Sequence, residues 1–99
     1  MFRHVVMLRW TDTATADDRR AVLDGLASLP PAIPEIRSYR VGVDAGLVPD
    51  ANFDLAIVAD FDDIAGYLVY RDHPVHQAVI AEHIRPILAS RAAVQHELD

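Results

Sequence analysis

Two histidines and one tyrosine are the residues of this sequence that could carry out acid–base chemistry. His4 lies in an alternating apolar stretch near the start of the chain, and His76 lies in a helical pattern near its end. Tyr70 precedes His76 by six residues. A desolvated imidazole has a lowered pKa, so it stays neutral and can remove a proton near pH 7. His4, Tyr70 and His76 therefore form a candidate catalytic site if the fold brings them together.

Each of these residues also has a structural interpretation. A histidine on an apolar face is commonly a core residue with one hydrogen bond, and a lone tyrosine commonly packs in a core. His83 shares the helical face of His76 but could equally meet solvent, and His96 is expected to be exposed. The spacing of His73 and His76, with Asp72 beside them, would suit a metal ion, but no third and fourth ligands are evident. We therefore expect no metal site.

Several classes of protein are excluded by what the sequence lacks. It has no cysteine, which excludes disulfides, iron–sulfur clusters and cysteine nucleophiles. It has no glycine-rich phosphate loop, no His-Glu-x-x-His pair and no Gly-x-Ser-x-Gly elbow. Fifteen acidic residues against nine arginines give a net charge of −6, which argues against a nucleic-acid partner. No cofactor is expected.

Alternating apolar patterns predict the strands that would position these side chains. Residues 2–10 place His4 on the face that also carries Phe2, Val6, Leu8 and Trp10. Residues 36–44 and 53–61 alternate in the same way, and residues 90–98 are expected to form a last strand.

Helical segments separate these strands. Thr15 and Asp18 form a capping-box pattern that begins a helix, which Pro30–Pro31 should stop. A short helix is expected over residues 62–71. A longer helix is expected over residues 74–88, with a proline in its first turn and another near its end.

The order of elements is β-α-β-β-α-β, which predicts an α+β, ferredoxin-like fold. Right-handed crossovers place both helices on one face of a four-stranded antiparallel sheet. The composition, 52% apolar and 24% charged, is that of an ordinary globular protein. We expect a single domain over residues 1–99.

The second face of this sheet also carries apolar side chains. If Val6, Leu8 and Ile57 face the helices, seven apolar residues face the other way: Val5, Met7, Tyr39, Val41, Val43, Ala56 and Val58. A monomer does not normally leave such a patch exposed. We expect a homodimer through this open sheet face. The alternative is that one strand is shifted by one residue, which would exchange its two faces.

No apolar run approaches the roughly 20 residues that a membrane span requires. The first ten residues carry Arg3 and Arg9 within their apolar stretch, which is typical of a strand and not of a signal peptide. We expect a cytoplasmic protein with no membrane partner.

Four segments of the sequence resemble the stress-responsive A/B barrel (Dabb) family. They are Met-Phe-Arg-His-Val-Val-Met-Leu at the start, Tyr-Arg-Val-Gly-Val-Asp from Tyr39, Phe-Asp-Leu-Ala-Ile-Val-Ala-Asp-Phe from Phe53, and Tyr-Arg-Asp-His-Pro-Val-His-Gln from Tyr70. The resemblance spans essentially the whole chain. It implies ferredoxin-like subunits whose sheets pack into a dimeric α/β barrel.

The resemblance also implies a chemistry. The family includes a plant polyketide cyclase that catalyses an intramolecular aldol condensation without a cofactor, in a pocket between sheet and helices. By analogy His76 would be the general base, and Tyr70 and His4 would orient or polarise a small polyketide or aromatic ligand. The last strand, Ala92-Ala93-Val94-Gln95, lacks the carboxylate that the cyclase has near its first histidine.

Two functional hypotheses of different class follow. The first is a small enzyme, a lyase or cyclase, that works by acid–base catalysis without a cofactor. The second is a non-catalytic stress-responsive or ligand-binding protein, in which the same side chains form a hydrogen-bonded core cluster. A cofactor-free monooxygenase fits less well, because the only tryptophan, Trp10, lies near the end of its strand.

Overall fold

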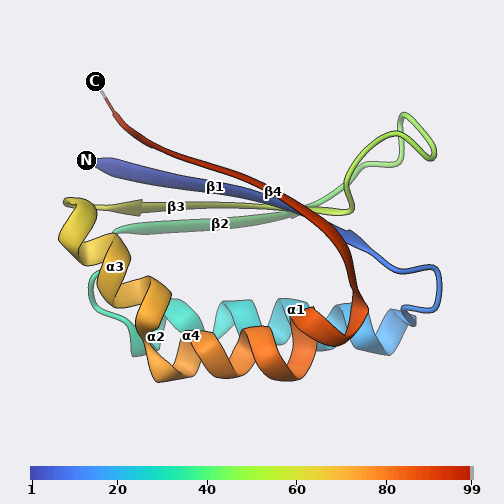
Figure 1. The fold of residues 1–99 in the computed structure, drawn as a ribbon, viewed down its shortest axis with the longest axis horizontal. Helices are drawn as coiled ribbons and strands as arrows, with labels where there is room; N and C mark the ends of the chain where they lie inside the picture. The colour runs from blue at the N-terminus through green and yellow to red at the C-terminus, as the bar shows by residue number, and fades with distance from the viewer. Residues whose placement is uncertain (99) are drawn as a thin grey trace.

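The computed structural model describes residues 1–98 as two layers, a β-sheet and a set of helices that covers one of its faces (Figure 1). Within these residues the sheet has four strands in the order β2-β3-β1-β4, and each neighbouring pair is antiparallel. The strands are β1 (Phe2–Trp10), β2 (Ser38–Val43), β3 (Leu55–Phe61) and β4 (Leu88–Glu97). The predicted α+β ferredoxin-like fold is confirmed.

The first crossover contains α1 (Ala16–Ala27) and the short helix α2 (Leu29–Ala32). The predicted capping box forms: the Asp18 N–H donates to the Thr15 hydroxyl, and the Thr15 N–H donates to the Asp18 carboxylate, both at 3.0 Å. Pro30 and Pro31 do end the first helix, but they also lie in the first turn of α2. In a first turn the backbone N–H groups have no helical partner, so the N–H that proline lacks costs no hydrogen bond.

The second crossover begins with α3 (Ile64–Asp72), and three helical segments of different types follow it. These are α4 (Pro74–Val79), a π-helical turn η1 (Ile80–Ile84) and a 3₁₀ turn η2 (Arg85–Ile87). In the π turn the Arg85 N–H bonds to the Ile80 carbonyl. Pro86 has no N–H to continue an α-helix, so β4 begins directly afterwards, two residues earlier than expected. No helix among residues 1–98 is long and apolar enough to cross a membrane.

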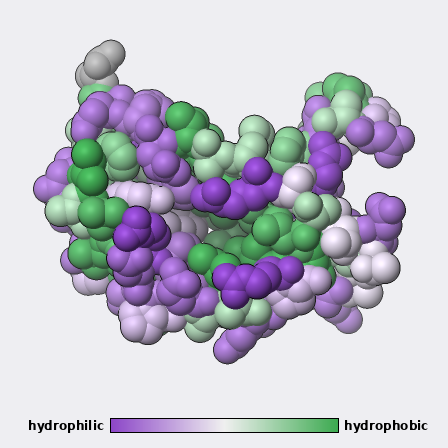
Figure 2. Space-filling model, in the orientation of Figure 1, coloured by the Kyte–Doolittle hydropathy of each residue, from purple (hydrophilic) through white to green (hydrophobic). Residues whose placement is uncertain are grey.

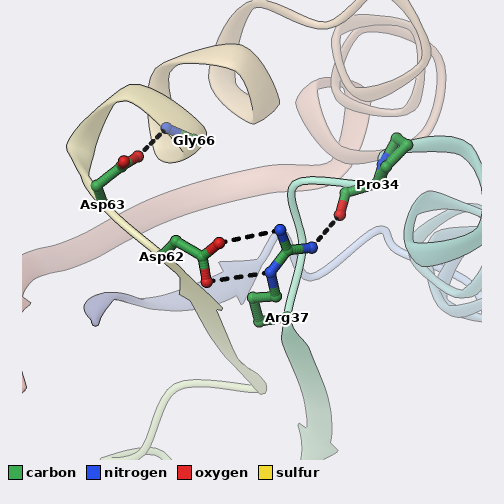
Figure 3. A network of polar contacts seen from close by, with 5 residues as sticks. All are labelled: Pro34, Arg37, Asp62, Asp63 and Gly66. Atoms are coloured by element: carbon green, nitrogen blue, oxygen red, sulfur yellow. Dashed lines mark hydrogen bonds and ion pairs between the residues drawn. The ribbon is translucent and has the colours of Figure 1, made fainter.

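An ion pair and a helix cap fix the junction between β3 and α3 (Figure 3). The Arg37 guanidinium donates two hydrogen bonds of 3.0 Å to the Asp62 carboxylate and one of 2.6 Å to the Pro34 carbonyl. The Asp63 side chain accepts from the Gly66 N–H at 2.9 Å and so caps α3. This corner sets the direction of the helix that carries Tyr67 and Tyr70.

The hydrophobic core fills the space between the two layers. Its fully buried side chains come from α1, α2, β3 and α3: Val22, Leu26, Leu29, Ile33, Phe61 and Tyr70. Burial of these large side chains supplies most of the driving force that holds helices on this face.

Strand β2 faces the opposite way from our prediction. Tyr39, Val41 and Val43 pair directly with Ala59, Ile57 and Leu55 of β3. Directly paired residues point to the same side of a sheet, and the β3 partners are buried under the helices. The prediction that Tyr39, Val41 and Val43 lie on the open face is therefore wrong. The alternation of side chains within β2 was clear from the sequence. Which set faces the helices depends on the register between β2 and β3.

The open face of the sheet remains apolar along its middle strands. Val5 pairs with Val58 and Val94, and Met7 pairs with Ala56 and Ala92. Met7 is 40% exposed and Val94 is 54% exposed, because nothing in residues 1–98 covers this face. A hollow of about 480 Å³ lies on it, and no histidine or tyrosine lines that hollow.

Candidate functional site

A cavity of about 330 Å³ lies between the sheet and the second crossover, and His4, Tyr70 and His76 all line it. Figure 2 shows this side of the molecule hollowed between the two layers, with hydrophobic surface inside and strongly hydrophilic groups above and below. The structure thus brings the three predicted site residues to one space. The apolar part of the lining comes from β1, β3, β4 and the helices: Val6, Leu8, Leu26, Ile57, Ile80, Ile84 and Leu88.

His4 is held on the inner face of β1 by a partner from β4. It is only 5% exposed, and its Nδ1 lies 2.8 Å from the amide Nε2 of Gln95, the residue directly opposite on β4. An amide NH₂ can only donate, so Nδ1 accepts and the neutral ring carries its proton on Nε2. Burial, reinforced by the charge of Arg91 and by His76, lowers the pKa of His4 to about 4. His4 is therefore a neutral N–H donor at physiological pH.

His76 has the opposite tautomer. Its Nδ1 lies 3.1 Å from the carbonyl oxygen of Arg71. A carbonyl can only accept, so Nδ1–H donates and the lone pair of the neutral ring is on Nε2. Burial lowers the pKa of His76, and its hydrogen bond to Arg71 opposes this shift. His76 is therefore a neutral base with a free lone pair.

The break between α3 and α4 explains how His76 acquires this partner. Helix α3 ends at Asp72, so the carbonyls of its last turn lack helical partners. The Arg71 carbonyl accepts from His76 and also from the Gln77 amide at 2.6 Å. At the start of α4 the His73 Nδ1 accepts from the Val75 N–H at 3.1 Å, and Pro74 follows His73 as the first residue of α4.

Tyr70 supports the imidazole of His76 and holds its own hydroxyl away from free solvent. The two rings are stacked, with centroids 4.1 Å apart and planes inclined by 29°. The Tyr70 hydroxyl lies 2.9 Å from the hydroxyl of Tyr39 on β2. Burial raises the pKa of Tyr70 to about 12, and it raises the pKa of Tyr39 as well. Both phenols remain neutral, so Tyr70 acts on this site through packing and hydrogen bonding.

Other histidines and the suggested metal pair lie outside this arrangement. His83 is half-exposed and packs beside Gly25 of α1, and the exposed His96 bonds to the carbonyl of Glu97. His73 uses its Nδ1 to cap α4. Among residues 1–98, no group of three or more histidines and carboxylates could hold a metal ion.

Four residues of the site were missed by sequence reasoning. Arg91 of β4 lines the cavity, and Gln95 of the same strand bonds His4. Tyr39 and Tyr67 complete the aromatic cluster around His4 and Tyr70. Gln95 lies opposite His4 only because of the β1–β4 register. The sequence signal for Tyr67 and Tyr70 is their i, i+3 spacing on one helix face.

The arrangement joins a proton acceptor and a proton donor in one largely apolar space. His76 Nε2 can take a proton, and His4 Nε2–H can hydrogen-bond an oxygen that gains negative charge. The low polarity of the surrounding side chains strengthens both interactions.

An α+β ferredoxin-like sheet with a histidine site beneath it defines the class of protein. The chain belongs to the stress responsive A/B barrel domain (Dabb) family, whose model matches residues 2–97. A dimeric ferredoxin-like protein of unknown function from Thermobifida fusca is 46% identical and has a TM-score of 0.89, with 98% of this chain and 90% of that chain covered. No curated protein matches the chain.

Two more distant structures share the fold. A Dabb family protein with a ferredoxin-like fold from Mesorhizobium loti is 18% identical, with a TM-score of 0.80 over 98% of this chain and 95% of that chain. A hydroxynitrile lyase from Passiflora edulis is also 18% identical, with a TM-score of 0.85 over 99% of this chain and 93% of that chain. At these identities the likeness shows the fold alone.

Proposed function

We propose that the chain is a cofactor-independent acid–base enzyme that catalyses lyase or cyclase chemistry of the polyketide-cyclase type. Its substrate is a small polyketide or aromatic carbonyl compound bound between sheet and helices. The observation that carries this proposal is the complementary protonation of the two imidazoles, a free lone pair on His76 and a bound proton on His4, in one cavity of about 330 Å³.

The proposed reaction needs only proton transfers and one new carbon–carbon bond. His76 Nε2 removes a proton from a carbon beside a carbonyl, and the electron pair moves to the carbonyl oxygen as an enolate. His4 Nε2–H hydrogen-bonds that oxygen. The enolate carbon then attacks a second carbonyl of the same molecule, and the His76 imidazolium returns its proton to the alkoxide so formed. Tyr70 is a positioning residue, because it holds the His76 ring by stacking.

The second hypothesis, a non-catalytic ligand-binding protein, is favoured by one observation. Within residues 1–98 no buried side-chain nitrogen or oxygen lacks a hydrogen-bond partner. The hydrogen bonds of His4 to Gln95 and of Tyr39 to Tyr70 are also what a purely structural role would require.

A homodimer through the open sheet face is part of the proposal. Solved relatives from Thermobifida fusca and Bacteroides fragilis are described as dimeric, which supports a homodimer here. The uncovered strip of Val5, Met7, Val58 and Val94 supports the face. Residues 1–99 would form one domain of this dimer, in keeping with the family match over residues 2–97.

Deuterium incorporation tests the catalytic step directly. Acetophenone is incubated with the protein in D₂O, and loss of its methyl proton signal is followed by NMR. We expect the natural chain to accelerate exchange and His76→Gln to lose about 100-fold or more of that rate. His83→Gln, outside the cavity, should keep the full rate. Equal rates for the natural chain and His76→Gln, with both folded, would overturn the proposal and favour the ligand-binding hypothesis.

A further inference from the structure

Three arginines from three elements line the cavity, although the chain as a whole is acidic. They are Arg71 at the end of α3, Arg85 in η2 and Arg91 in β4. No aspartate or glutamate of residues 1–98 lines the same cavity. In a chain of net charge −6, this is a local concentration of positive charge. Figure 2 shows strongly hydrophilic groups on both sides of the hollow.

Two of these three guanidinium groups have no carboxylate partner among residues 1–98. Arg71 donates two hydrogen bonds, of 2.8 Å and 3.1 Å, to Asp72, so its charge is neutralised locally. Arg85 and Arg91 form no ion pair and no side-chain hydrogen bond within residues 1–98. A guanidinium group presents donors in a rigid fork that matches the two oxygens of a carboxylate.

The register of β4 places Arg91 on the cavity side of the sheet. Arg91 pairs with Leu8, which is buried on the helix-covered face. A shift in register between Arg9 and Trp10 leaves Ala89 unpaired, and so Leu88 and Arg91 share that face. The charge of Arg91 also contributes to the lowered pKa of His4, which is consistent with a guanidinium close to the site.

The rest of the lining limits the size and polarity of what could bind. Val6, Leu26, Ile57 and Ile84 give the cavity an apolar wall. A cavity of about 330 Å³ holds about eleven groups of the size of water, at ~30 Å³ each. That is room for one ring or a short chain with a few substituents.

We propose that the cavity selects a small amphipathic anion, an apolar ring or chain bearing one carboxylate that Arg85 and Arg91 hold at the opening. This inference rests on the proposed function, in which His76 removes a proton from a carbon beside a carbonyl. It adds a carboxylate on the substrate that orients the molecule in the cavity. A neutral ligand would gain no charge interaction from these two guanidinium groups, which are exposed to solvent.

Binding of matched probes tests the anion anchor. Dissociation constants of phenylacetate and its neutral isostere phenylacetamide are measured by NMR titration of isoleucine and leucine methyl groups at low salt. We expect phenylacetate to bind about tenfold or more tightly. The double variant Arg85→Met/Arg91→Met should lose this preference. Arg20→Met is the matched control, because Arg20 is exposed on α1 and does not line the cavity, and it should keep the preference.

Salt dependence in the natural chain gives the same answer without a variant. Raising the ionic strength should weaken phenylacetate binding and leave phenylacetamide binding unchanged. Equal affinities for the two probes would overturn the inference, as would tenfold tighter binding of phenyl phosphate, which would assign the anchor to a phosphate. Loss of His76-dependent exchange with intact phenylacetate preference would instead overturn only the proposed function.

Discussion

At the scale of single residues, the hydrogen-bond partner of each imidazole decides its role. Gln95 gives His4 a donor and Arg71 gives His76 an acceptor, so two identical side chains hold their protons on different nitrogens. The two partners come from different elements, one from the edge strand β4 and one from the end of α3. Substitution of Gln95 should therefore change the chemistry of His4 only, whereas the Arg71 carbonyl belongs to the backbone and remains after substitution of the Arg71 side chain.

The lowered pKa of His4 predicts an acid-sensitive stability. Its native pKa of about 4 is below the unfolded value of about 6.5, so the unfolded state binds more protons between these values. Stability from this group is full above pH 6.5 and is lost as the pH falls toward 4, by up to about 3 kcal/mol. We expect chemical denaturation of the natural chain to show a steeper decline over this range than His4→Gln. Parallel curves would contradict the prediction.

The hydroxyl pair of Tyr39 and Tyr70 predicts a measurable coupling. Tyr39→Phe and Tyr70→Phe each leave one buried hydroxyl without its 2.9 Å partner, so each should lower the free energy of unfolding by about 1–3 kcal/mol. The double variant should lose less than the sum of the two, because neither hydroxyl then remains unpaired. Denaturant titration of all four proteins measures the cycle, and Tyr67→Phe serves as the control. Strict additivity would show that the two hydroxyls do not interact.

The sequence predicted the site residues whose orientation follows from apolar periodicity. It missed those whose position depends on the register between paired strands. The alternation around His4 and the helical spacing around His76 place both side chains toward the core, and the structure has them there. Gln95 and Arg91 depend on which residue of β4 lies opposite His4 and Leu8. No local pattern encodes that register, because the last strand is nearly uniform in its small and polar residues.

At the scale of elements, the same distinction separates the strands. Phe2–Trp10 was predicted with its bounds and its inner face as observed. β2 was placed correctly in the chain but with its faces exchanged, because Tyr39, Val41 and Val43 suited either side equally well. The π turn after Val79 was not predicted either, because helix periodicity describes only a regular helix.

The cap of α1 gives a prediction at this scale. Thr15→Ala removes the hydroxyl that accepts from the Asp18 N–H, so it should lower the free energy of unfolding by about 1 kcal/mol. Thr13→Ala is the matched control, because the Thr13 hydroxyl contacts only the hydroxyl of Thr11 on the exposed surface. Thermal or urea denaturation compares them. Equal stability of the two variants would mean that the capping box does not stabilise the helix in solution.

At the scale of the whole molecule, the proposed homodimer gives a prediction about the open face of the sheet. Met7→Glu places a carboxylate in the middle of the proposed dimer interface, where burial of an unpaired charge is unfavourable by several kcal/mol. We expect sedimentation velocity to show a dimer for the natural chain and a monomer for Met7→Glu.

The control for this prediction is Leu68→Glu. Leu68 of α3 is 39% exposed, against 40% for Met7, but it lies on the helical layer. Leu68→Glu should remain a dimer. Dissociation by Leu68→Glu, or a dimeric Met7→Glu, would place the interface elsewhere on the surface.

The pairing of β1 with β4 joins residues that lie far apart along the chain. His4 and Gln95 are separated by 91 positions, so the closing loop spans most of the chain, and contacts of such long range form late in folding. A nascent chain that contains His4, Tyr70 and His76 but not yet β4 still lacks the strand that orients His4. Under the proposed function, the capacity for proton transfer would therefore arise only after β4 has been synthesised and has paired with β1.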